Sequence, residues 1–189
     1  MKLNNKKPII PKLRFPEFQN SGEWEVKRLG EVFNLQDGYS FSSKDFSSEE
    51  NDESYQVVRI TEINNKNKNE DKVYISSETA KKIDLECFKI IKGDLLLSLT
   101  GAAGFNFFIW KDNKKAFLNQ RTLKLIPKDE NNDSIKYLAE PLLFKKINSL
   151  GTGQNNNLSK SILEQIKIPL PSLPEQQKIA SCLSSIDEV

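Results

Sequence analysis

Histidine is absent from this 189-residue chain, and cysteine occurs only as Cys87 and Cys182. The lack of histidine excludes His-based triads, imidazole general bases and His metal ligands. The two cysteines are far apart and form neither a CxxC pair nor a disulfide framework, a usage typical of a reducing cytosol. No apolar run approaches about 18 residues, so no membrane span is predicted. The basic start lacks the apolar stretch of a signal peptide, and we therefore expect a cytoplasmic protein.

Motifs for nucleotide chemistry are also missing. There is no GxxxxGK[ST] loop, and the stretch GAAG at 101–104 does not match GxGxxG. No serine lies in a GxSxG elbow. We therefore predict no cofactor, no metal and no catalytic residues, although the abundant acids leave a paired-carboxylate site open as an alternative.

The chain nevertheless contains enough apolar material for a packed core, with 37% hydrophobic residues and 11 phenylalanines. Its length suits one domain. β-Branched and aromatic runs predict strands, and apolar residues at helical spacing predict helices. The predicted strands cover 55–63, 88–99 with a turn at 92–94, 105–110 and 121–127, and the predicted helices cover 133–150, 158–166 and 174–189. Residues 111–120 are predicted to be a hairpin loop. Pro141 is predicted to kink or split its helix, and Ser159 to cap the helix over 158–166. The expected fold class is α+β, a β-rich domain with short helices.

The N-terminal segment is rich in lysine and proline. We predict a flexible basic arm over 1–12, after which Leu13, Phe15, Phe18 and Trp24 dock the chain onto the domain. The domain itself is predicted over 13–172, followed by a helix start over 173–189.

Charge is distributed unevenly along the sequence. Residues 111–128 hold six bases and one acid, 145–170 hold four bases and one acid, and 42–71 hold four bases and eight acids. A domain with one basic and one acidic face would orient itself on a polyanion. The alternative is an ordinary solvated surface, which charge alone favours.

Polar residues in the predicted loops are candidates for reading bases. Asn and Gln can pair with adenine edges, and Arg can bind guanine with two hydrogen bonds. Eighteen asparagines are present, although asparagine is also common in turns for structural reasons. The candidate DNA-binding residues are Lys44, Arg59, Thr61, Asn64, Thr100, Asn119, Gln120, Arg121, Thr152, Gln154, Asn155 and Asn156. For each of them, the alternative is a solvated side chain or one that satisfies a turn.

Four segments, taken in order, resemble a known family. They are PKLRFPEF (11–18) with RLGEVF (28–33), GDLLLSLTGAAG (93–104), LNQRTLKLIP (118–127) and GTGQNNNLSKSILEQIKIPLPSLPEQQKIASCLSSID (151–187). Together they resemble the specificity subunit of type I restriction-modification systems, over about residues 11–189. The last segment is the most specific, because it is similar to the loop, short helix, proline-bounded strand and helix start that close one target recognition domain.

The resemblance implies a function and partners. Such subunits contain two recognition domains, each reading half of a split DNA sequence, separated by helices that pair as a coiled coil. The helices dock methyltransferase subunits, which bring S-adenosylmethionine and the catalytic residues, and restriction needs a further translocase-nuclease subunit. The chain is expected to be the first recognition domain with the first turns of a truncated spacer helix. It would bind double-stranded DNA without catalysing a reaction.

Two other functions remain open. The stretch 174–189 carries an apolar stripe at Ile179, Leu183 and Ile186, which predicts a partner helix. On this reading the chain is a protein-interaction module that docks a methyltransferase or pairs two chains. The third possibility is a fragment of a nuclease or methyltransferase, against which the missing motifs argue.

Overall fold

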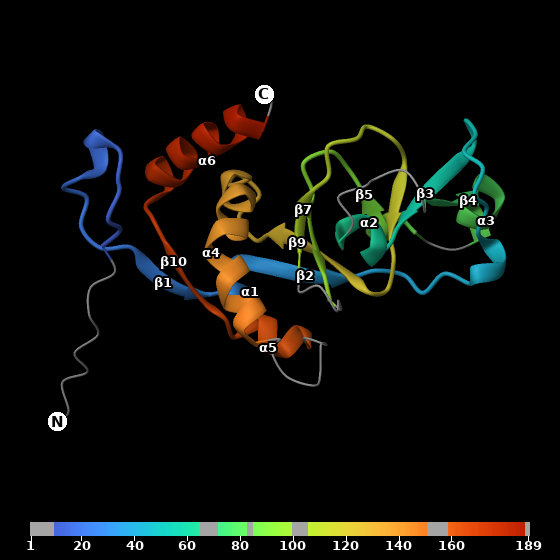
Figure 1. Cartoon of the computed structure of the whole chain (residues 1–189), viewed down its shortest axis with the longest axis horizontal. Helices are drawn as coiled ribbons and strands as arrows, with labels where there is room; N and C mark the ends of the chain where they lie inside the picture. Colours follow the sequence, from blue (N-terminus) through green and yellow to red (C-terminus); the bar gives the residue numbers. More distant parts are fainter. Residues whose placement is uncertain (1–9, 65–71, 83–84, 100–105, 151–158, 188–189) are drawn as a thin grey trace.

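The computed structural model describes residues 10–64, 72–82, 85–99, 106–150 and 159–187. Figure 1 shows an elongated molecule, with α6, β1 and β10 at one end and β3, β4 and α3 at the other. Two four-stranded sheets and a two-stranded pair form the β structure. The α+β class predicted from the sequence is confirmed.

The strands fall into three groups. The first sheet has the order β2 (Phe33–Asp37), β9 (Thr122–Pro127), β6 (Leu95–Ser98) and β7 (Phe107–Ile109), and all its pairs are antiparallel. The second has the order β4 (Val73–Ser76), β3 (Ser54–Val58), β8 (Ala116–Leu118) and β5 (Lys89–Ile90), with β3 and β8 parallel. The remaining pair joins β1 (Glu25–Arg28) to β10 (Lys167–Leu170).

Most helices are short. The α-helices are α1 (Leu29–Val32), α2 (Ile60–Asn64), α3 (Ser77–Lys82), α4 (Ser134–Leu150), α5 (Lys160–Glu164) and α6 (Leu173–Asp187). Three 3₁₀ turns are η1 (Pro16–Phe18), η2 (Ser43–Asp45) and η3 (Glu86–Phe88). The two long helices, α4 and α6, contact each other.

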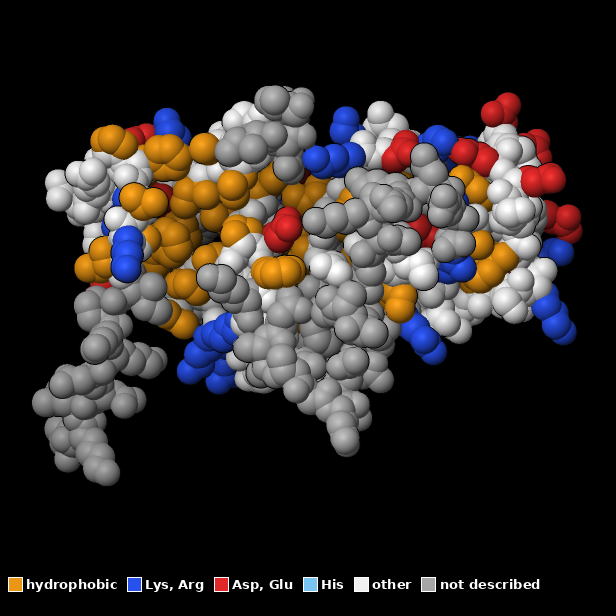
Figure 2. Space-filling view, viewed as in Figure 1, with side chains coloured by type: hydrophobic (Ala, Val, Ile, Leu, Met, Phe, Trp, Pro, Cys, Tyr) orange, Lys and Arg blue, Asp and Glu red, His pale blue; other side chains and the backbone are white. Residues whose placement is uncertain are grey.

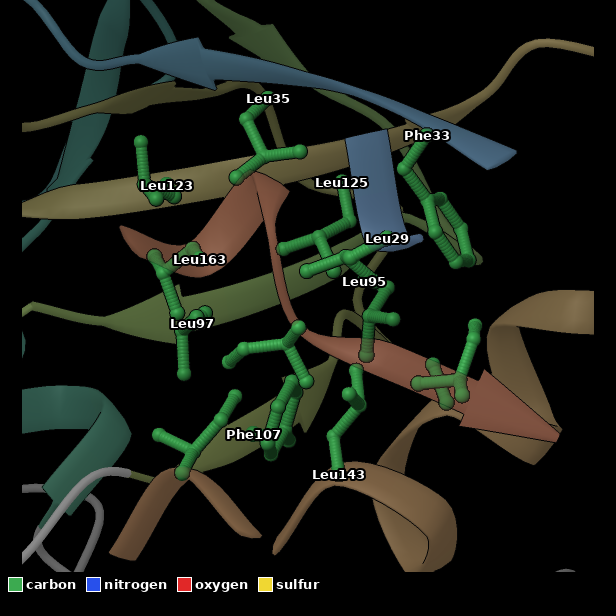
Figure 3. Close-up of a cluster of buried hydrophobic side chains, with 14 of the residues drawn as sticks. Leu29, Phe33, Leu35, Leu95, Leu97, Phe107, Leu123, Leu125, Leu143 and Leu163 are labelled. Carbon is green, nitrogen blue, oxygen red and sulfur yellow. The ribbon is translucent and has the colours of Figure 1, made fainter. Parts of the chain in front are cut away.

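Strand β6 joins two hydrophobic cores, because both of its faces are buried. Leu95 and Leu97 lie opposite Leu125 and Leu123 in the core that α4 and α5 cover, as Figure 3 shows. Leu96 points to the other face and packs in a second cluster with residues of the other sheet. Successive side chains of a strand point to opposite faces, so an unbroken apolar run such as 95–97 is what this central position requires.

Three predictions about the strands are wrong. The predicted strand over 55–63 ends at Val58, because the carboxylate of Glu62 accepts a hydrogen bond from the Arg59 backbone N–H at 2.5 Å and α2 begins there. The predicted hairpin loop over 111–120 contains β8, whose apolar residues pair with β3 and β5. Strands β7 and β9 do not pair with each other and instead flank β6.

Other local predictions gave mixed outcomes. Pro141 does not split α4; its side chain is exposed, so the carbonyl that loses its helical partner can be solvated. The turn at 92–94 is confirmed, with Gly93 at φ +91°. Ser159 caps α5 as predicted, since its side chain accepts from the Ile162 N–H.

The docking of the N-terminal segment differs from the prediction. Leu13 is 91% exposed, so it does not dock, while Phe15, Phe18 and Trp24 are half-buried. Arg14 makes the strong contact instead, through an ion pair with Glu175 in the first turn of α6. Sequence patterning missed this because a lone arginine gives no sign of its partner. Residues 1–9 of the predicted arm lie outside the described residues.

Candidate nucleic-acid interface

A tight turn joins the two sheets where β8 ends and β9 begins. The Asn119 N–H donates to the Val58 carbonyl at 3.1 Å, and the Asn119 carbonyl accepts from the Thr122 N–H and from Thr122 Oγ1 at 3.0 and 2.5 Å. The Leu99 N–H donates to the Arg121 carbonyl at 3.0 Å. The turn is therefore held by the ends of β3 and β6 as well as by its own strands.

Gly38 closes the same turn from the other side. The Tyr39 N–H donates to the Leu118 carbonyl at 2.8 Å. A Cβ at position 38 would lie 2.1 Å from the Asn119 carbonyl oxygen, much closer than such atoms can approach. Only glycine fits there, and four chain segments are consequently brought together around the β8–β9 turn.

This turn presents two of its three candidate readers. Gln120 and Arg121 are exposed, whereas Asn119 is only 7% exposed. The backbone of Asn119 organises the turn, and its side chain is inside the protein. An amide and a guanidinium thus project from a rigid support, which suits direct contacts to bases.

Arg59 and Thr61 lie next to this turn, because Arg59 follows Val58. The Arg59 side chain is half-buried and its Nε lies 3.4 Å from a Glu62 carboxylate oxygen, while Thr61 on α2 is exposed. Burial raises the pKa of Glu62, and its hydrogen bond and charge interaction with Arg59 oppose that shift. Asn64 is the last residue of α2, and its side chain lies outside the described part.

The start of α5 borders the same edge. Lys160 Nζ lies 3.3 Å from a carboxylate oxygen of Asp37, the residue that precedes Gly38. This ion pair places the first residue of α5 beside the end of β2 that leads into Gly38. Five candidates lie outside the described residues: Thr100, Thr152, Gln154, Asn155 and Asn156.

Lys44 is separated from the other candidates. It lies in η2, and it is exposed. The segment that follows η2 carries the exposed acids Glu49, Glu50, Asp52 and Glu53. Figure 2 shows acidic side chains gathered at this end of the molecule, which carries β3, β4 and α3.

The predicted single basic face does not form from residues 111–128. Lys124 is buried, 3.6 Å from Asp94, and donates to the Lys89 carbonyl at 2.6 Å. Lys114 pairs with Glu50 at 2.5 Å, and Lys128 donates to the Gly30 carbonyl. Lys114 precedes β8, Lys124 lies within β9 and Lys128 follows β9, so their nearness in sequence does not gather them in space.

Two lysines of 111–128 and two from another segment surround one groove. Lys89 and Lys92 line it from one side, and Lys114 and Lys115 from the other, around a volume of about 490 Å³. Sequence patterns could not predict this group, because the two pairs of lysines come from distant segments that meet when β5 pairs with β8.

The helix α6 carries the predicted partner-binding stripe. Ile179 and Leu183 are half-buried, and Leu173 is 41% exposed. Ile186 lies within the helix, but its side chain is outside the described part. Figure 2 shows apolar side chains over this end of the molecule, around α4 and α6.

In the ranges that the structure describes, no three Cys, Asp or Glu side chains come together as a possible metal site. None of the described helices combines the length and apolar character that crossing a lipid bilayer requires.

Comparisons with known proteins give a consistent result. Residues 21–189 match the sequence profile of the family described as "Type I restriction modification DNA specificity domain". The chain is 31% identical over 181 residues to the type I restriction enzyme MjaVIII specificity subunit of Methanocaldococcus jannaschii, covering 94% of this chain and 38% of that protein. It is 27% identical over 165 residues to the EcoBI specificity subunit of Escherichia coli, covering 86% and 32%.

A solved structure shares the fold. The type I restriction-modification S subunit from M. genitalium superposes with a TM-score of 0.69 at 21% identity, covering 95% of this chain and 42% of that one. The chain therefore spans about two fifths or less of the length of these proteins.

Proposed function

The chain belongs to the type I restriction modification DNA specificity family, and from this we propose that it recognises one half of a bipartite sequence in double-stranded DNA. The other half would be read by a second domain of the same kind. Partner subunits, a methyltransferase and through it a translocase-nuclease, would perform the chemistry, so the chain itself is non-catalytic. It would act in the cytoplasm, with the DNA that it reads.

The observation that carries this proposal is the exposed pair Gln120 and Arg121 on a turn fixed by both sheets. A reader must keep its side chain at a defined position against a base edge. Arg121 can bind guanine O6 and N7, and Gln120 can bind adenine N6 and N7. Arg59 and Thr61 beside the turn would extend the contact.

Lys92 and Lys115 of the lysine groove would supply the complementary phosphate contacts, because the other two lysines already form ion pairs, Lys89 with Glu86 and Lys114 with Glu50. Lys115 directly precedes β8, whereas Gln120 and Arg121 follow it, so the groove and the turn lie at opposite ends of one strand. At about 3.3 Å per residue, three residues span roughly 10 Å, close to the ~12 Å width of the major groove. With Arg121 in the major groove of the DNA, the lysines would lie against the phosphates of a flanking strand. They would thereby fix the register of the protein on the duplex.

The test is selection of binders from a randomised duplex pool, repeated with two variants. Arg121→Ala should remove preference at one base position, a discrimination of about 1–3 kcal/mol. Lys92→Ala should weaken all sequences alike and reduce the slope of log affinity against log salt by about 1. Lys81→Ala, an exposed lysine on α3, is the control and should change neither. A pool without consensus, or equal sequence-blind losses for Arg121→Ala and Lys92→Ala, contradicts the proposal.

A second function, docking of a methyltransferase subunit, is supported by α6. Its apolar residues Leu173, Ile179 and Leu183 are incompletely covered by the rest of the chain. We expect Ile179→Lys with Leu183→Lys to abolish co-purification with the methyltransferase while duplex selection by the chain stays unchanged. If the variant pair still assembles, the helix is not the docking surface. Sedimentation of the chain alone separates this role from pairing of two chains.

A further inference from the structure

A small cavity lies next to the end of β3 that contacts the β8–β9 turn through Val58. It has a volume of about 190 Å³ and is bounded by β3, α2 and the end of β7. Gln56 and Val58 line it from alternate positions of β3, and Phe108 and Trp110 line it from β7 and the residue that follows. Glu62 on α2 and three charged side chains complete the lining: Lys72, Lys111 and Asp112.

Two buried polar atoms in this lining have no partner. Gln56 is 3% exposed and Trp110 is 5% exposed. Within the described structure, neither Gln56 Oε1, an acceptor, nor Trp110 Nε1, a donor, makes a hydrogen bond. An unpaired buried polar group costs about 1–3 kcal/mol, so native proteins rarely leave two of them beside one cavity. An occupant with one donor and one acceptor would satisfy both.

The strand register fixes the side of β3 from which the Gln56 side chain leaves. Its backbone N–H is fixed to the Lys115 carbonyl at 3.0 Å, and Gln56 pairs with Ala116 and with Tyr74 across the neighbouring strands. Because alternate residues share a face, Gln56 points to the same side as Val58. That side is where Trp110 packs with Val58 in the second core cluster.

The size and walls of the cavity restrict the occupant. Drug-sized sites begin at about 300 Å³, whereas one water occupies about 30 Å³. The cavity is therefore suited to a molecule of one or two rings. Phe108 and Trp110, with ring centroids 6.1 Å apart and planes at 78°, supply aromatic surface that favours a flat ligand.

We propose that this cavity binds a nucleobase, whose edge donates a hydrogen bond to Gln56 Oε1 and accepts one from Trp110 Nε1. Every nucleobase carries a donor and an acceptor on neighbouring atoms of its pairing edge, together with a flat face. The base has two possible sources, a free base or nucleoside and a base extruded from a bound duplex. The second source rests on the proposed DNA recognition, and the first does not.

The fluorescence of Trp110 can report the binding of a free base or nucleoside. Its two tryptophans are Trp24 and Trp110, so Trp24→Phe leaves Trp110 as the single indole. Titration of this variant with each free nucleoside should quench its fluorescence saturably. Gln56→Leu in the same background should weaken binding about tenfold, the loss of one hydrogen bond to a buried partner.

Equilibrium dialysis with labelled nucleoside tests the donor. Trp110→Phe keeps an aromatic ring and removes Nε1–H, and it should also weaken binding about tenfold. Trp24→Phe is the matched control, because Trp24 Nε1 is likewise buried without a partner among the described residues but does not line this cavity. It should bind as the unsubstituted chain does. Circular dichroism and urea unfolding establish that each variant is folded.

The second source is tested with duplexes from the selected pool that carry 2-aminopurine at single positions. Extrusion should brighten the 2-aminopurine with the unsubstituted chain and not with Gln56→Leu. Saturable nucleoside binding without any duplex binding would uphold the cavity and end the proposed DNA recognition. Duplex binding with neither nucleoside binding nor brightening would show that the cavity holds only water, and would overturn this inference while leaving DNA recognition intact.

Discussion

Two regions of the molecule bury polar side chains in opposite ways. At the start of α6, Glu175 binds Arg14 through two contacts of 2.8 and 2.6 Å, and Gln176 accepts from Asn132 Nδ2 and donates to the Pro171 carbonyl, each at 2.8 Å. In the β3–β7 cavity, Gln56 Oε1 and Trp110 Nε1 have no partner in the described structure. Satisfied buried polarity specifies one geometry, here the direction in which α6 leaves the domain. Unsatisfied polarity is the feature expected of a site that awaits a ligand.

The largest effect is expected from breaking the satisfied region. In the Arg14–Glu175 pair the side chains are 5% and 1% exposed. Arg14→Met leaves the Glu175 carboxylate buried and unpaired, so the free energy of unfolding in urea should fall markedly.

An exposed ion pair on the same elements provides the control. Lys178 and Glu17 are 3.2 Å apart, with side chains 51% and 47% exposed, and Lys178→Met should cost no more than about 1 kcal/mol. Arg14→Met combined with Glu175→Met should recover most of the loss, because no charge is then stranded. Equal losses for Arg14→Met and Lys178→Met would mean that the buried pair does not hold α6.

The same substitution, glutamine to leucine, should have opposite effects at the two buried glutamines, Gln176 and Gln56. Gln176→Leu removes two hydrogen bonds and leaves the Asn132 amide and the Pro171 carbonyl unpaired, so unfolding should require about 2–3 kcal/mol less. Gln56→Leu removes an acceptor that bonds to nothing, and it should be neutral or stabilising. Urea unfolding of both variants is the measurement. A similar loss at Gln56 would show that its side chain is satisfied after all.

A substitution at Gly38 should displace the β8–β9 turn without changing Gln120 or Arg121. In Gly38→Ala the new methyl meets the Asn119 backbone, which cannot move away easily, so we expect a destabilisation of about 1–3 kcal/mol and altered base preference in duplex selection. Gly30→Ala is the control for destabilisation alone: its Cβ would meet Glu164 of α5 at 3.0 Å (Cβ) and 3.3 Å (backbone oxygen), so it should destabilise the chain and leave base preference unchanged. Unchanged selection by Gly38→Ala would indicate that bases are read elsewhere.

Local patterns predicted much of the fold, and long-range pairing explains what they missed. The turn at Gly93 and the Ser159 cap followed from neighbouring residues alone. Strand β8 was missed because three apolar residues among lysines give a weak pattern. Its strand conformation depends on parallel pairing with β3, which is distant in sequence. The predicted docking of Leu13 was wrong because Arg14 found a partner 161 positions away.

The candidate site followed the same rule. Gln120 and Arg121 could be predicted as exposed turn residues, whereas the burial of Asn119 depends on Gly38 and Val58, which approach it only in the folded chain. The lysine groove and the cavity were beyond prediction, since each assembles from segments that no sequence window contains together.

The smallest effect concerns the charge on the cavity wall. Burial raises the pKa of Glu62 above its ordinary value, so the ionised form is penalised in the folded state. This penalty is present at pH above the raised folded pKa, and it disappears as the pH falls below the unfolded value. Glu62→Gln, which retains an oxygen to accept from the Arg59 N–H, should therefore stabilise the chain at neutral pH by at most about 1 kcal/mol. Its advantage in urea unfolding should vanish in acid, and an advantage independent of pH would show that packing rather than ionisation separates the two side chains.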